Sequence, residues 1–478
     1  MKRATNKKVS LSLNNVIKVA LSNIFVLFAG LLTGFILPKI MGISEYGYYK
    51  AFTLYISYSS IFRFGIVDGI YLLYGGMAYD ELEKNKFRFY SQFLCVFEII
   101  ISAVLITICA ISLSGEYRNI FIFVAIYIWS FNMTSYYQVI SQITGRFNEL
   151  SLRNSLQALF TSVGVVIFWI ICRHGNQDLN YESYILFYTC IQILLTIWYM
   201  YTYKDITFGT NTGKYNKFEE IITLLKVGLP LLFSNLCATL MLNVDRQFVN
   251  VLFDNEVYAK YAFAYNMLTL VTVATTAVST VVYPILKRTD DKQLKNNYDL
   301  LEMGMLLLVF SALTIYFPLK LFINYFLPKY IDSIDIFKVI FPGLAMSSVI
   351  MVIMHNYYKT LGRNMEFFIK SVSILGMSII ANTIVYYIYG TPVSISIASI
   401  IVMLLWYLLI EAYFIKHFNL NWKRNFLYLV IMMVYFYLCT NINNNFIGLG
   451  VYLFGLVLIT LLLHYKKRGN FISLILNK

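Results

Sequence analysis

Long apolar segments alternate with short polar connectors along the whole chain, and this pattern predicts a bundle of membrane-spanning helices. A helix that crosses a bilayer needs about 20 mostly apolar residues. Fourteen segments meet this requirement to within a few residues. They are residues 15–37, 47–75, 88–113, 118–140, 154–173, 181–203, 221–252, 257–284, 298–324, 334–358, 366–389, 392–415, 425–440 and 446–465. The sequence therefore predicts an all-α polytopic membrane protein.

Composition supports this class and provides little evidence for metal chemistry. The chain is 59% hydrophobic and 13% charged, whereas soluble proteins carry about 25% charged residues. The six cysteines lie in apolar runs without metal-binding spacing. We therefore expect no metal and no cofactor. The N-terminal apolar run is too long for a secretory signal, so we expect it to remain as the first helix.

The net charge of +14 is explained by topology. If the N-terminus is cytoplasmic, 25 basic residues lie in the inner segments and 4 in the outer loops. Lysine and arginine accumulate in short cytoplasmic loops, so both termini are predicted to be cytoplasmic. The inner charge would also contact anionic lipid headgroups. The sequence gives no reason to expect nucleic-acid binding.

The chain carries a weak internal repeat. A shift of 212 residues places Ser22 on Ser234 and Tyr46 on Tyr258, with similar helix lengths and a turn after the first helix of each half. An even number of helices in the shift gives both halves the same orientation, and parallel repeats place a substrate site between them. The expected domains are an N-lobe, a cytoplasmic linker, a C-lobe and a final helix pair with a tail. Their boundaries are 1–203, 204–220, 221–416 and 417–478.

Two stretches resemble a known family. "NVDRQFVNVLFDNEVYAKYAFAYNM" (Asn243 to Met267) and "LPKIMGISEYGYYKAF" (Leu37 to Phe52) are similar to bacterial polysaccharide flippases of the multidrug/oligosaccharidyl-lipid/polysaccharide exporter superfamily. Length, twelve-plus-two helices and basic inner loops agree along the whole chain. The resemblance implies a MATE-like fold of two six-helix lobes with two extra C-terminal helices.

The same resemblance implies a function. Members of this family move undecaprenyl-pyrophosphate-linked oligosaccharide from the inner to the outer leaflet of the bacterial plasma membrane by alternating access. It makes the polysaccharide polymerase and the chain-length regulator candidate partners. The sequence does not distinguish O-antigen from capsule, and it does not name the coupling ion.

Asp245 and Arg246 stand side by side in the apolar segment 221–252. A charge at the centre of a membrane helix costs about 2.5 to 3.5 kcal/mol on insertion scales. At 100° per residue, Arg246 shares a wedge of about 80° with four neutral polar residues. These are Asn235, Thr239, Asn243 and Asn250. We expect the wedge to face protein or water, with Arg246 binding the pyrophosphate, since arginine binds phosphate through a bidentate fork.

Other polar residues extend this hypothesis to the neighbouring segments. Segment 257–284 carries Tyr265, Thr269, Thr272, Thr276, Ser279 and Tyr283 at helical spacing. The further candidate substrate contacts are Lys50, Arg63 and Lys260, and the candidates for charge pairing or ion coupling are Asp68, Glu98 and Asp245. On a continuous helix over 47–75, Lys50 and Asp68 fall on one line, and the depth of Glu98 would let it pair with Arg63.

Each assignment has a structural alternative. Hydroxyl stripes also pack helix against helix, Asp245 could serve only to neutralise a buried cation, and the lysines could extend to the interface. Two functional alternatives also remain at this point. One is a cation-coupled multidrug antiporter, which would use buried carboxylates. The other is a membrane-embedded oligosaccharide polymerase, for which the short outer loops supply few catalytic residues.

Overall fold

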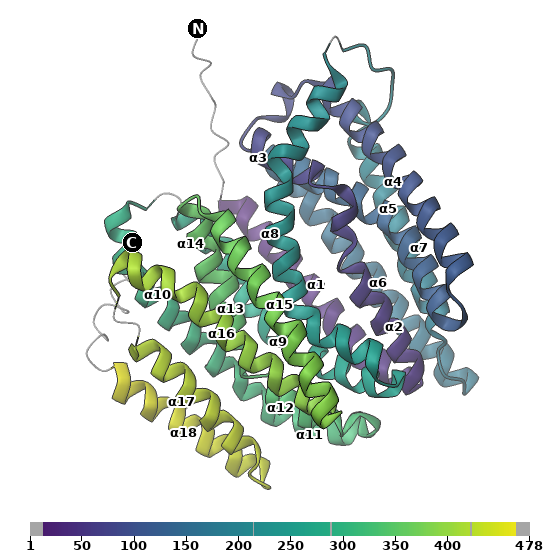
Figure 1. The fold of residues 1–478 in the computed structure, drawn as a ribbon. Helices are drawn as coiled ribbons and strands as arrows, with labels where there is room; N and C mark the ends of the chain where they lie inside the picture. The colour runs from purple at the N-terminus through teal and green to yellow at the C-terminus, as the bar shows by residue number, and fades with distance from the viewer. Residues whose placement is uncertain (1–12, 214, 287–288, 421–422, 465–478) are drawn as a thin grey trace. The chain divides into compact units, whose positions relative to one another are not determined.

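The computed structural model describes residues 13–213, 215–286, 289–420 and 423–464, and within these ranges all regular structure is helical (Figure 1). Among the described residues, ten helices are long and apolar enough to cross a membrane, and the number rises to 12 if each of two bent helix pairs is counted as one span. The helices α9 and α17 coincide with predicted spans but are not among these 12. The all-α prediction is confirmed, and the count of fourteen spans stays a prediction.

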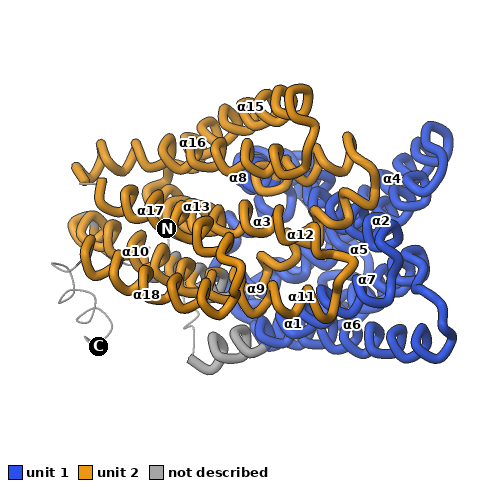
Figure 2. The backbone as a smooth tube through the Cα atoms, turned by 90° about the horizontal axis from the view of Figure 1, so that it is seen from below, with its two compact units in different colours: residues 1–239 blue, residues 240–478 orange. Residues whose placement is uncertain are grey.

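The chain divides into two compact units, residues 1–239 and 240–478, shown in blue and orange in Figure 2. In the first unit, α1 packs on α6, α4 on α5, and α5 on α7. The bounds in this unit are α1 Leu13–Ile40, α2 Ile43–Ile56, η1 Ser59–Arg63, α3 Ile66–Tyr74, η2 Tyr79–Glu81, α4 Lys84–Ser112, α5 Gly115–Ile143, α6 Phe147–Gly175, α7 Tyr181–Thr202 and η3 Lys204–Ile206. Helix α8, Lys217–Leu252, crosses the boundary between the units.

In the second unit, α15 packs on α16, α17 on α18, and α9 on α12. The bounds are α9 Asn255–Leu286, α10 Asp291–Ala312, η4 Leu313–Ile315, α11 Tyr316–Phe326, η5 Pro328–Tyr330, α12 Ser333–Ile340, α13 Gly343–Ser348, η6 Val349–Met354, α14 His355–Thr360, α15 Asn364–Tyr389, α16 Pro392–Phe418, α17 Lys423–Thr440 and α18 Asn445–His464. The predicted domain boundaries at 203 and 220 stay a prediction. They were drawn from the internal repeat, whereas the two units are defined by their compactness.

Two predicted spans are broken, and the expectation of continuous helices was wrong for both. Segment 47–75 bends by 63° between η1 and α3, and segment 334–358 bends by 45° between α12 and α13. At the first break, Phe64 and Gly65 adopt left-handed φ values of 49° and 83°, which interrupt a right-handed helix. At the second break, Pro342 lacks the amide hydrogen that a continuous helix requires. Lys50 and Asp68 therefore do not lie on one helix.

Close backbone contact fixes the first break. A Cβ atom on Gly228 of α8 would lie 1.9 Å from the carbonyl oxygen of Gly65, and a Cβ on Gly69 would lie 2.3 Å from that of Leu224. Only glycine allows two helices to approach this closely. The glycines therefore hold α3 directly against the first half of α8.

A shared turn supports the internal repeat. Gly145 precedes α6 with φ of 72°, and Gly362 precedes α15 with φ of 69°. In each case an arginine follows the glycine, and its amide donates to a carbonyl five residues earlier, at 2.8 Å from both Arg146 and Arg363. The same Gly-Arg turn thus connects corresponding helices in the two units.

Part of the charge count that predicts the topology falls on residues that the structure does not describe. Residues 1–12, 214, 287–288, 421–422 and 465–478, which include several of the basic residues counted above, lie outside the described residues. The cytoplasmic placement of both termini therefore stays a prediction.

Candidate functional site

Asp245 and Arg246 sit in the second half of α8, where their side chains point to different partners. Asp245 is 2% exposed. Its Oδ2 accepts hydrogen bonds from the hydroxyls of Tyr261, at 2.9 Å, and Tyr265, and its Oδ1 accepts the amide of Arg246 at 2.8 Å. Both tyrosines belong to α9. The carboxylate is therefore held by neutral donors on the next helix.

The Arg246 guanidinium is held by neutral groups. Its carbon lies 4.8 Å from the centroid of the Tyr265 ring. Its Nη2 donates to the Asn243 side chain and, at 3.5 Å, to the Leu242 carbonyl. Its Nε is buried without a hydrogen-bond partner among the described residues. One donor of the fork is thus unused, although a buried N–H is expensive to leave unpaired.

A cavity of about 220 Å³ lies against these two residues within the second unit. Its walls come from α8, α9, α12, α13, α15 and α16. The polar groups that line it are, besides Asp245 and Arg246, the side chains of Tyr265, Thr269, Thr272, Ser347, Ser378 and Ser399. About seven water molecules would fill this volume at liquid density. The cavity can therefore hold water or a small polar group beside the guanidinium, but not an oligosaccharide.

The remaining members of the predicted α8 wedge are asparagine and threonine side chains that are buried or partly buried. Asn243 and Asn250 are each 5% exposed. Asn235 and Thr239 are partly buried in the portion of α8 that belongs to the first unit, and the Thr239 hydroxyl donates to the Asn235 carbonyl at 3.0 Å. This bond is internal to the helix and leaves the Asn235 side-chain amide for other partners.

The hydroxyl stripe of α9 is described only in its first part. Thr269 and Thr272 line the cavity, and their hydroxyls also bond to carbonyls of their own helix at 2.6 and 3.0 Å. The side chains of Thr276, Ser279 and Tyr283 lie outside the described residues. With Tyr265, the stripe therefore reaches the cavity at three of its predicted positions.

In the first unit, Arg63 pairs with Asp68, and the predicted pairing of Arg63 with Glu98 was wrong. The Arg63 Nε and Nη2 donate to the two Asp68 oxygens at 3.1 and 3.2 Å. Glu98, which is fully buried, accepts instead from the Asn132 amide at 3.0 Å. The reason is the break at Gly65, which turns α3 so that Asp68 reaches back to Arg63.

The two candidate lysines, Lys50 in the middle of α2 and Lys260 near the start of α9, have protein partners. The Lys50 ammonium lies 5.2 and 5.3 Å from the centroids of the Tyr46 and Tyr49 rings. Lys260 forms an ion pair with Asp332 at 2.5 Å, and the acid is 73% exposed. Exposed pairs of this kind contribute about 1 kcal/mol or less, so Lys260 can exchange its partner for an anionic ligand.

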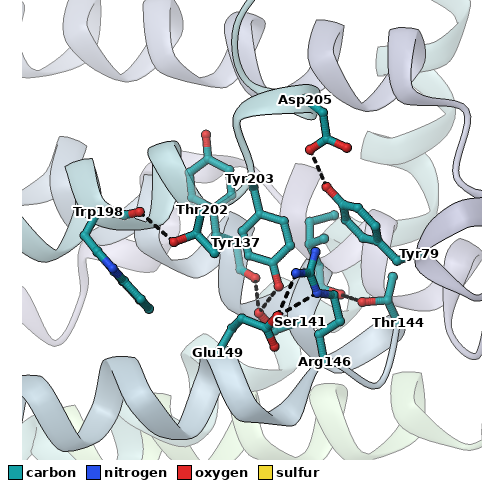
Figure 3. A network of polar contacts seen from close by, with 11 residues as sticks. Tyr79, Tyr137, Ser141, Thr144, Arg146, Glu149, Trp198, Thr202, Tyr203 and Asp205 are labelled. Carbon is teal, nitrogen blue, oxygen red and sulfur yellow. Dashed lines mark hydrogen bonds and ion pairs between the residues drawn. The ribbon is translucent and has the colours of Figure 1, made fainter.

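A polar network that was not predicted from the sequence lies in the first unit, around the start of the connector formed by the predicted linker, residues 204–220 (Figure 3). Tyr79 donates to Asp205 at 2.6 Å, and Lys84 pairs with the same acid at 2.7 Å. Arg146 pairs with Glu149 at 2.7 Å and lies 4.4 Å from the centroid of the Tyr79 ring. These contacts fasten the connector to α4, η2 and the Gly-Arg turn.

The network also changes proton affinity. Partial burial of Asp205 raises its pKa, but the hydrogen bonds from Lys84 and Tyr79 outweigh this effect and hold the pKa below its ordinary value. Burial and the hydrogen bond to Asp205 raise the pKa of the Tyr79 hydroxyl. The network therefore contains an ionised carboxylate at neutral pH.

Two buried glutamates of the second unit were also missed. Glu302 on α10 and Glu411 on α16 are each 1% exposed. The available signal was a single acid inside the apolar run "LLWYLLIEAYF", since an ionisable residue in a span is a functional candidate. Among the described residues, no group of three or more His, Cys, Asp or Glu side chains could hold a metal ion.

Comparison with solved structures defines the class of the protein. The lipid II flippase MurJ in its inward closed conformation superposes with a TM-score of 0.69 at 14% identity, covering 95% of this chain and 99% of that chain. An inward-facing MATE family multidrug transporter gives 0.60 at 12% identity, with 85% and 98% covered. A Vibrio cholerae MATE transporter gives 0.58 at 12% identity, with 85% and 97% covered. The chain is thus a multi-pass membrane protein with the fold shared by these transporters.

Sequence comparison gives the family. Residues 12–290, more than half of the chain, match the family described as polysaccharide biosynthesis protein, and the chain belongs to this family. No curated protein matches the sequence. The MATE-like fold and the family predicted from the sequence are both confirmed.

Proposed function

We propose that this protein is a flippase that carries undecaprenyl-pyrophosphate-linked oligosaccharide repeat units from the inner to the outer leaflet of the bacterial plasma membrane. Its family supports a role in polysaccharide biosynthesis, and one protein of the same fold is a lipid II flippase. The product would supply O-antigen, capsule or another surface glycan. The proposal includes cytoplasmic termini, no enzymatic activity of its own, and the polymerase and chain-length regulator as candidate partners.

The unpaired Nε of the Arg246 guanidinium is the observation that carries the mechanism. A pyrophosphate needs cationic donors that are not already neutralised by a neighbouring acid. Asp245 satisfies its own oxygens with two tyrosines and a backbone amide, so the guanidinium keeps its charge and a buried free donor. The hydroxyls around the adjoining cavity would donate further hydrogen bonds to the headgroup. Arginine in such a setting binds phosphate with directed hydrogen bonds.

The other predicted residues take supporting roles in this proposal. Lys50 and Lys260 would attract the headgroup during entry or release, whereas the charge of Arg63 is already neutralised by Asp68. The polar residues Asn235, Thr239, Asn243 and Asn250 would line the path. Asp68, Glu98 and Asp245 would set the charge of the pathway or couple it to an ion.

A multidrug antiporter is the second candidate, because Asp245 borders a cavity. A cationic drug would need an ionised carboxylate with oxygens available to it. Both oxygens of Asp245 already accept hydrogen bonds, which favours the flippase. No arrangement of described residues favours the third candidate, an oligosaccharide polymerase.

The proposal is tested by reconstitution of R246A into proteoliposomes that contain a fluorescent undecaprenyl-pyrophosphate oligosaccharide. Loss of a charged hydrogen-bonding group costs about 1.5 to 3 kcal/mol, so the flipping rate should fall by at least about tenfold. R173A is the matched control, because Arg173 is exposed near the end of α6, where it lies over the Trp169 ring. Normal flipping by R246A would remove the headgroup role, and efflux of cationic dyes by the wild-type protein would favour the antiporter.

A further inference from the structure

Two helices of the second unit exchange a pair of tyrosine–glutamate contacts. On α10, Tyr298 precedes Glu302 by four residues, and on α16, Tyr407 precedes Glu411 by four residues. The Tyr298 hydroxyl donates to Glu411 Oε2, and the Tyr407 hydroxyl donates to Glu302 Oε1. Each helix therefore supplies one donor to the acid of the other helix.

The hydrogen bonds described for these carboxyls come from neutral groups. Glu302 Oε2 accepts from the Asn425 amide of α17 at 2.7 Å. Glu411 Oε1 is buried and has no hydrogen-bond partner among the described residues. Tyr298, Tyr407, Glu302 and Glu411 are all at most 1% exposed. A buried carboxylate oxygen without a hydrogen-bond donor is costly to keep as an ion, and a neutral acid costs far less.

The charged surroundings make ionisation of both acids less favourable still. The charged groups that act on Glu411 among the described residues are Glu302 and Asp299, which are both acidic. On α14, Tyr358 lies near Glu411 and Glu366, and its hydroxyl accepts from Lys370 of α15 at 2.9 Å. That lysine pairs with Glu366 at 2.9 Å, so its charge is already compensated. Ionisation of both glutamates would place two like charges in one buried site, which is unfavourable.

We propose that Glu302 and Glu411 form a proton-binding site inside the second unit, in which Glu411 holds the proton on Oε1. Binding adds one proton from solvent to one carboxylate and forms one O–H bond, so the step needs no other reactant. A metal ion is a poor alternative, because the described residues contain no cluster of three or more ligating side chains. Glu411 lies seven residues before the end of α16, about 10 Å along the helix axis. A proton therefore needs to travel only a short distance to reach it.

The site can be detected without any transport assay. Infrared spectra of the purified protein in nanodiscs at neutral pH, compared between the wild type and its variants, should contain the C=O stretch of a protonated buried carboxylic acid. E411Q should lose that band, whereas E366Q, which alters a partly exposed glutamate paired with Lys370, should retain it. A wild-type spectrum without the band, or an unchanged band in E411Q, would overturn the proposal.

A second variant guards against misfolding of E411Q. Y298F removes the hydroxyl that donates to Glu411 Oε2 and leaves the acid in place, so the band should remain and shift in frequency. An unshifted band in Y298F would show that the protonated group is a different acid. Disappearance of the wild-type band on addition of sodium or potassium ions would assign the site to a metal cation and reject the proton.

A role of this proton in transport rests on the proposed flippase function. If the pair couples to flipping, an imposed pH gradient should accelerate flipping by the wild type and not by E411Q, which should still flip slowly without a gradient. An E411Q variant that responds to the gradient like the wild type would reject the coupling and leave the flippase proposal intact. Absence of flipping in the wild type would instead reject the flippase function and leave the infrared result intact.

Discussion

The two units handle buried charge in opposite ways. In the first unit, Arg63 and Asp68 face each other across a helix break and form a two-bond ion pair. In the second unit, Asp245 and Arg246 are adjacent in sequence, yet the acid bonds to tyrosines and the guanidinium stacks on Tyr265. In the first arrangement the two charges neutralise each other, whereas in the second a cation stays available for a ligand.

The difference follows from backbone geometry. Neighbouring residues on an α-helix point about 100° apart, so Asp245 and Arg246 cannot form a close side-chain pair while α8 stays helical. The left-handed φ values at Phe64 and Gly65 reverse the chain locally and bring Asp68 back to Arg63. A helix break therefore creates a structural ion pair, and an unbroken helix separates two charges that stand side by side.

Matched asparagine variants should show the largest contrast between the two regions. D68N should destabilise the protein by about 3 kcal/mol, because removal of one partner leaves a buried charge unpaired. The double variant R63M/D68N should recover much of this loss. Unfolding in mixed micelles, followed by circular dichroism, gives the free energies. A double variant as unstable as D68N would show that the pair does not act as a unit.

D245N should have a smaller effect on stability than D68N. An asparagine side-chain oxygen at this position can still accept from the tyrosine hydroxyls, so the expected loss is about 1 kcal/mol, the value of a typical hydrogen bond. The free energy of unfolding is measured in the same mixed micelles. A loss equal to that of D68N would mean that Asp245 serves mainly to neutralise Arg246, as Asp68 does for Arg63.

The connector network should give the smallest effect, and it should depend on pH. The pKa of folded Asp205 is lowered, so its contribution to stability is present above the pKa of the unfolded chain, about 3.9, and is lost as pH falls through the lower folded value. Because Asp205 is 35% exposed, screening limits the contribution to below about 1 kcal/mol. In thermal unfolding measured across pH, D205N should therefore reduce stability slightly at neutral pH and lose less on acidification than the wild type.

Hydropathy was sufficient to place nearly every helix, because each span must bury about 20 apolar residues regardless of its neighbours. It could not place the breaks at Gly65 and Pro342, where single residues with special backbone requirements override an apolar pattern. The error over Glu98 followed directly, since a straight helix was assumed between Lys50 and Asp68. The charge pair on α8 was visible because it interrupts one local run.

The glutamate pair shows a different limit of sequence reasoning. Glu302 and Glu411 lie on helices far apart in the chain, and the lone acid in the apolar run of α16 does not reveal its partner. Only the packing of α10 near α16 reveals that each acid meets a tyrosine from the other helix. Pairing of this kind depends on three-dimensional neighbours, which periodicity along a single helix does not specify.

Binding of undecaprenyl pyrophosphate to nanodisc-embedded protein tests the role of Arg246 most directly. Affinity should fall from wild type to R246K, which keeps a point charge but loses the fork, and fall further in R246A, to at least about tenfold below wild type. Undecaprenol, which has no phosphate, should bind all three proteins equally. Equal affinity of wild type and R246A for the pyrophosphate would contradict the account.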